Sequence, residues 1–192
     1  MRLHGGVRLG WLGLAALLAA PLAGCSTLGS LFGGEDADVM LKGNDPVTYF
    51  VAGRPMPGHR DITARHRERT YRFASDENRR LFITSPERYV PQFDGFCAKS
   101  MTYAIPVPAE PEHFKIIDGR LYLFETVRAR IYFDMDQERN LRLATRYWDT
   151  EVRDANPTLQ ALKRQMFRVP NYKTEEELLA EYERRFGRKP GT

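Results

Sequence analysis

Two sulfur-containing residues offer the clearest candidate chemistry in this sequence of 192 residues. Cys97 and Met101 have the spacing Cys-x3-Met. If this segment is helical, the two sulfur atoms share one face, because side chains four residues apart are neighbours. A thiolate and a thioether form a soft pair that suits Cu(I), and His113 lies in a strand that we expect near them. The pattern predicts a copper site at Cys97, Met101 and His113. The simpler alternative is that Cys97 is a buried apolar side chain and Met101 fills space.

The other cysteine, Cys25, ends an N-terminal signal. Residues 1–24 combine two arginines with a short apolar run, which is typical of a secretory signal and too short for the ~20 apolar residues that span a bilayer. The tetrapeptide LAGC that ends at Cys25 resembles the bacterial lipobox, whose cysteine receives a diacylglycerol. By resemblance to lipoproteins of enteric bacteria, Ser26 at the next position favours the outer membrane. We therefore expect an exported protein that is lipid-anchored to the outer membrane and faces the periplasm.

Charge and cysteine count exclude several classes of function. With Cys25 acylated, Cys97 has no partner, so no disulfide can form within the chain. Loss of residues 1–24 removes two arginines and lowers the net charge from +4 to +2. The remaining charges are interspersed, and an exported protein does not meet nucleic acid, so we expect no nucleic-acid partner. The chain has no Gly-x-Ser-x-Gly elbow, His-Glu-x2-His helix or glycine-rich phosphate loop, so we expect no enzyme.

The elements that position the candidate residues are short. Residues 25–38 form a Gly/Ser-rich tether, and the folded part is expected to start near Val39. The patterning then predicts, in order, a turn at residues 43–46, a strand at 47–51, a half-buried strand at 70–73 with Tyr71 and Phe73 on one face, a helix capped by Ser75 that buries Leu81 and Phe82, and a short helix from Pro86.

The second half has stronger local signals. Asp118-Gly119 between two alternating apolar runs predicts a hairpin with a type I′ turn. An amphipathic helix follows, with Leu141, Ala144 and Trp148 on its apolar stripe. After residue 154 we expect a short helix that Pro170 ends, and a second helix that opens with a capping box and buries a stripe of Leu178, Leu179, Tyr182 and Phe186.

Several of these segments together resemble one family. The stretches LKGNDPVTYF, TYRFASDENRRLFITSPERYVPQFDGFCA and DGRLYLF, with Trp148 downstream, are similar to the YHS-domain lipoproteins of Gram-negative bacteria over roughly residues 41–148. The broader YHS and TRASH-like families imply metal handling through cysteines. At the corresponding positions this chain has Thr48, Ala74 and Asn78. The resemblance therefore implies the fold, but not the metal site of the wider family, and a four-ligand zinc site is not expected.

We therefore predict an α+β fold with a small antiparallel sheet, short packed helices and a helical C-terminal extension. The predicted organisation is a signal peptide (1–24), a tether (25–38), a YHS-like domain (39–153) and the extension (154–192). The predicted function is a non-enzymatic module that binds a metal ion or a small ligand. The alternative is a structural or interaction lipoprotein in which residues 155–192 dock a protein partner, although we expect the last helix to pack on its own domain.

Overall fold

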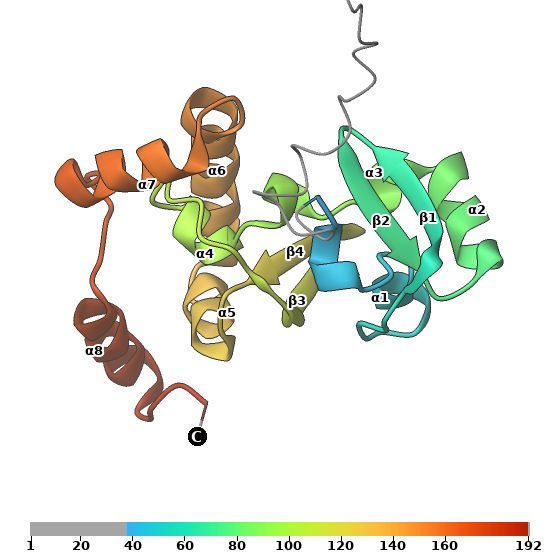
Figure 1. The fold of residues 1–192 in the computed structure, drawn as a ribbon. Coiled ribbons are helices and arrows are strands. Elements are labelled where there is room, and N and C mark those ends of the chain that lie inside the picture. The colour runs from blue at the N-terminus through green and yellow to red at the C-terminus, as the bar shows by residue number, and fades with distance from the viewer. Residues whose placement is uncertain (1–37, 192) are drawn as a thin grey trace, which may run out of the picture. The chain divides into compact units, whose positions relative to one another are not determined.

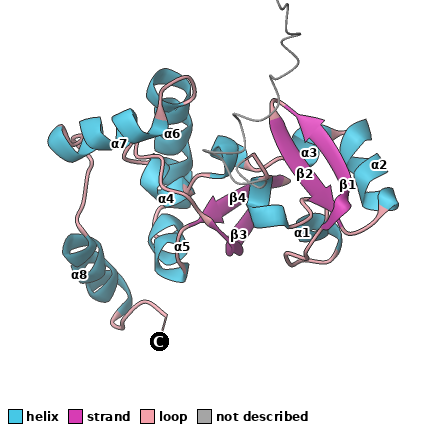
Figure 2. Ribbon diagram, viewed as in Figure 1, coloured by secondary structure: helices cyan, strands magenta, loops and turns pink. Residues whose placement is uncertain are grey.

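The structure is a computed structural model that describes residues 38–191. The signal, the lipidation site at Cys25 and nearly all of the tether lie outside the described residues. The described part confirms the α+β prediction, since helices surround antiparallel strands (Figures 1 and 2). The strands form two separate two-stranded sheets rather than one, with β1 paired to β2 and β3 paired to β4.

The elements follow one another closely along the chain. The first half contains a turn at Met40–Gly43, α1 (Thr48–Val51), β1 (His59–His66), β2 (Arg69–Phe73), α2 (Asp76–Thr84), α3 (Pro86–Tyr89), a turn at Gln92–Gly95 and α4 (Ala98–Met101). The second half contains β3 (Glu110–Ile117), β4 (Arg120–Phe124), α5 (Val127–Asp134), α6 (Gln137–Tyr147), a π-helical turn at Trp148–Val152, α7 (Pro157–Met166) and α8 (Glu175–Phe186).

The predicted strand at residues 47–51 is wrong, because these residues form α1. The Asp45 carboxylate accepts a hydrogen bond from the Val47 N–H at 2.8 Å, and the Asp45 carbonyl accepts one from the Thr48 hydroxyl at 2.7 Å. These contacts turn the chain into a helix at its first residues. Val47 before the helix and Thr48 and Tyr49 within it are buried, whereas Val51 at its end is exposed. Their β-branched and aromatic types suggested a strand, but β-propensity reflects packing more than backbone preference.

The first hairpin and α2 follow the prediction with one exception. Tyr71 and Phe73 are buried on one face of β2, and Ser75 caps α2 by accepting the Asn78 N–H. Phe82 packs its ring against both aromatic residues, with centroid distances of 4.7 and 5.1 Å. The prediction that Leu81 is also buried is wrong, since it is exposed. Adjacent helical positions differ by about 100°, so Phe82 and Leu81 cannot both face β2.

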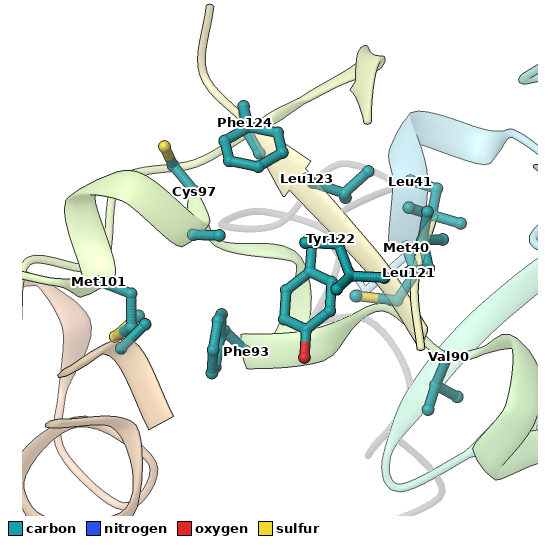
Figure 3. Close-up of a cluster of buried hydrophobic side chains, with 14 of the residues drawn as sticks. Met40, Leu41, Val90, Phe93, Cys97, Met101, Leu121, Tyr122, Leu123 and Phe124 are labelled. Carbon is teal, nitrogen blue, oxygen red and sulfur yellow. The ribbon is translucent and has the colours of Figure 1, made fainter. Parts of the chain in front are cut away.

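The second hairpin supplies the centre of the core. Asp118 and Gly119 both have positive φ, as the predicted type I′ turn requires. β4 has neighbours on both edges. It pairs with β3 on one edge and forms parallel bridges to Pro91 and Cys97 on the other. Its apolar side chains pack with those of the two turns at Met40–Gly43 and Gln92–Gly95, which both precede it in the chain (Figure 3).

The C-terminal helices pack on the rest of the domain. The predicted apolar stripe faces the main core: Ala144 of α6 is buried in it, and Leu141 of α6 and Trp148 of the π-helical turn are partly buried against it. Thr174 and Glu177 form the predicted capping box of α8, and Leu178 and Tyr182 pack against Tyr132 of α5. Phe186 is exposed, so the predicted buried stripe of α8 is shorter than expected. Among the described residues, no helix has both the length and the apolar character needed to cross a membrane.

Candidate functional site

Cys97 and Met101 lie at the two ends of a single helical turn. Cys97 immediately precedes α4, and its carbonyl accepts the Met101 N–H at 3.0 Å. Both side chains are completely buried. The sulfur atom of Cys97 points away from Met101 in Figure 3, and Cys97 is a free cysteine. The structure therefore places the two residues in one core without turning their sulfur atoms toward a common point.

His113 is separated from Cys97 by a strand. It lies on β3, whereas Cys97 forms a bridge to Leu123 on the opposite edge of β4. Two strand spacings place their backbones about 10 Å apart. Within residues 38–191, no group of three His, Cys, Asp or Glu side chains could hold a metal ion. The structure thus does not bring His113 to the sulfur pair.

The three positions at which the resemblance places cysteines meet around Asp45. The Thr48 hydroxyl donates to the Asp45 carbonyl, and the Ala74 N–H donates to its carboxylate at 2.8 Å. The Asn78 amide donates to the same carboxylate oxygen at 2.6 Å. Asp45 is completely buried, and these donors satisfy it. Asp45 therefore holds the turn that precedes α1, and the three positions at which the resemblance implies cysteines form hydrogen bonds to it.

A small polar cavity lies between α4, α6 and α8. Its volume is about 40 Å³, which is room for roughly three water-sized groups. The charged side chains that line it are Lys99, Asp136, Arg139, Lys173, Glu181 and Arg185. We call it the Lys99 cavity. It was not predicted from the sequence, although a lysine within the apolar run FCAKSM was a signal that could have found it.

Lys99 is the unusual member of this group. Its side chain is more than nine-tenths buried, and its ammonium donates to the Tyr103 hydroxyl at 2.7 Å. The ammonium also lies 4.1 Å from the centre of the Tyr103 ring, which is a cation–π contact. Burial lowers the pKa of Lys99 to about 8. Lys99 forms no ion pair within the described part of the chain.

Glu181 is the buried carboxylate of the cavity, but it is already paired with other cations. Glu181 binds Lys173 and Arg185 at the same time, and the Lys173 hydrogen bond is the largest influence that lowers the pKa of Glu181. Arg139 is exposed and has no ion pair among the described residues. Four cationic side chains and two carboxylates therefore line the cavity. The excess of positive charge suits a small anion.

Comparisons with known proteins assign no function to this site. No known family model, curated protein or solved structure matches the chain. The function is therefore inferred from the residues themselves.

Proposed function

We propose that this chain is an envelope lipoprotein whose YHS-like α+β domain is a non-enzymatic binding module for a small anion. The ligand would occupy the Lys99 cavity, with the Lys99 ammonium as its main cationic partner. A carboxylate or a small oxyanion fits both the volume and the positive charge of the cavity. The envelope location is supported by the lipobox-like LAGC at Cys25, and the domain class by the motifs between residues 41 and 148.

The observation that carries the proposal is the unpaired charge of Lys99. An ammonium taken out of water costs several kcal/mol unless an opposite charge compensates for it. The hydroxyl and the ring of Tyr103 offset part of this cost, but neither carries a negative charge. An anion in the cavity would supply the missing charge. Its binding free energy would therefore include relief of a cost that the ligand-free protein already bears.

The metal alternative has weaker support. Cu(I) at Cys97 and Met101 needs the two sulfur atoms to converge, and it needs a path through a completely buried core. His113 would have to cross the width of β4 to join them. Of the two predicted ligand classes, a small ligand is therefore better supported than a metal ion.

Titration of the purified full-length protein with acetate and with phosphate at pH 7 tests the proposal. We expect heat of binding in calorimetry, and a rise in thermal stability that grows with ligand concentration. In Lys99→Met, which keeps a long unbranched side chain, we expect at least a tenfold loss of affinity for the same anion. Lys42→Met is the matched control. Lys42 is an exposed lysine that binds Glu110 and does not line the cavity.

The comparison of the two variants decides the outcome. Equal binding by wild-type protein, Lys99→Met and Lys42→Met would show that anions associate with the surface only, and would refute the proposal. Circular dichroism of Lys99→Met checks that the fold is retained. Loss of the buried charge is expected to make this variant more stable than the ligand-free wild type, so misfolding should not obscure the result.

A further inference from the structure

α7 packs on the domain through polar side chains. Gln160 is buried, and its amide donates to the Ala104 carbonyl at 3.0 Å. One turn later on the same face, Arg164 is half-buried and binds Glu151. Helices of globular proteins usually turn their apolar stripe toward the core. The inward face of α7 is instead polar.

The apolar residues of α7 point outward. Leu159, Leu162 and Met166 follow the i, i+3, i+7 spacing of one helix face, and they are 66%, 52% and 68% exposed. Phe167, directly after the helix, is 66% exposed. None of the four belongs to either hydrophobic core cluster of the described residues. We call these four residues the α7 apolar face. Exposed apolar residues grouped in this way indicate a contact surface.

Positive charge is in excess beside this face. Residues 155–173 contain four basic side chains and no acidic one. Glu151, outside this range, binds Lys163 at 3.2 Å and also binds Arg164, so one carboxylate is shared by two of the four cations. Lys163 and Arg168 are exposed on this segment beside the apolar face. An apolar helix face with a large aromatic residue and flanking lysine or arginine is the pattern of a helix that lies in the interface of an anionic membrane.

We propose that the α7 apolar face inserts into the surface of a membrane that contains anionic lipids, with Lys163 and Arg168 at the level of the phosphate groups. A second copy of this chain fits the face less well. A two-fold contact would place the same basic segments opposite each other, and like charges in contact are unfavourable. A bilayer surface offers apolar and anionic groups together. This inference does not depend on the Lys99 cavity.

Tryptophan fluorescence of the full chain carrying Cys25→Ala, which removes the attachment point of the proposed acyl chains, tests the proposal when this protein is added to lipid vesicles. Phe167→Trp introduces a probe on the α7 apolar face, and wild-type protein gives the background of the two native tryptophans. With vesicles of brominated phosphatidylglycerol, we expect the added emission to shift to shorter wavelength and to be quenched. Ile83→Trp is the matched control, because Ile83 is an exposed apolar residue on α2. Its added emission should not be quenched.

A second variant tests the charge. In the same Cys25→Ala background, Lys163→Gln combined with Arg168→Gln should weaken binding to phosphatidylglycerol vesicles about tenfold or more, and vesicles of phosphatidylcholine alone should bind poorly. Equal quenching of Phe167→Trp and Ile83→Trp, or no quenching of either, would overturn the proposal. So would binding that is equal for anionic and neutral vesicles. A dimer in sedimentation that Leu162→Gln abolishes would assign the face to a second copy instead.

Discussion

The side-chain amide of Asn78 donates a 2.6 Å hydrogen bond to the carboxylate of Asp45, which lies 33 positions earlier in the chain. The same carboxylate accepts the N–H groups of Val47 and Ala74, at 2.8 Å each. One buried side chain therefore joins the turn before α1 to the turn between β2 and α2. It holds together the segments on which the family resemblance depends.

Asp45→Ala is expected to lower the free energy of unfolding by about 3 kcal/mol or more. Three donors lose a charged acceptor at a completely buried position, and each such bond contributes roughly 1–3 kcal/mol. Urea unfolding followed by circular dichroism measures the change. Asp61→Ala, at an exposed position of β1, should stay within about 0.5 kcal/mol of the wild type. Similar values for the two variants would contradict the structural role of Asp45.

The lowered pKa of Lys99 leads us to expect that the free energy of unfolding rises with pH. Burial lowers the pKa of Lys99 in the folded state to about 8, below its ordinary value of 10.5 in the unfolded chain. Between these values the unfolded state binds more protons, so the free energy of unfolding should increase from about pH 8 toward pH 10, by up to about 3 kcal/mol. Above its ordinary pKa of 10.5, Lys99 is neutral in both states, so its contribution stops rising. Stability should then fall, because burial raises the pKa of Tyr103 and of Tyr132 to about 12 and the unfolded chain loses these protons first.

The groups around Lys99 make a control necessary. Besides burial, the pKa of Lys99 is influenced by Cys97, Lys173, Glu181 and Arg139. The titratable side chains of Tyr103, Tyr132, Asp136 and Arg185 also line the cavity. Urea unfolding at several pH values from 7 to 9.5 should show the rise in wild-type protein and little of it in Lys99→Met. If both proteins gave the same slope, another group would be responsible.

The Cys97 thiol is expected to be inert in the folded protein. It is completely buried, so an aromatic disulfide reagent should modify it at least 100-fold more slowly in buffer than in denaturing urea. Measurement on the Cys25→Ala background isolates this thiol. Anaerobic titration with Cu(I) should give the same stoichiometry for this protein and for a version that also carries Cys97→Ser. Rapid modification, or copper binding that depends on Cys97, would support the sulfur site instead.

Cys25→Ala should release the protein from the membrane. The acyl chains would be attached through this thiol, and each buried methylene group contributes about 0.8 kcal/mol to anchoring. Fractionation of cells that produce wild type and variant, with labelled fatty acid in the medium, measures both location and lipid. Continued labelling of the variant would show that the lipobox assignment is wrong. A weaker residual association that depends on Lys163 and Arg168 would agree with contact through the α7 apolar face.

Several elements could be predicted because their signals are local. The type I′ turn at Asp118-Gly119, the Ser75 cap and the capping box from Thr174 to Glu177 all depend on residues within a few positions of one another. Hydrogen bonds over so short a distance need no tertiary contact to be recognised. The strand predicted at residues 47–51 failed for the complementary reason. Its apolar pattern fits a buried strand and a buried helix equally, and the contacts made by Asp45 decide between them.

The candidate sites depended on long-range packing. The turns, the caps and the α+β class follow from local patterns of residue types. The burial of Lys99 without a counterion among residues 38–191 could not be predicted in this way, because α6 and α8, which enclose its cavity, lie far along the chain. The outward orientation of the apolar side of α7 also depends on packing, since the contacts of Gln160 with Ala104 and of Arg164 with Glu151 set the orientation of the helix. A sequence pattern shows that a helix has two faces, but the partners that reach it through space determine which face is covered.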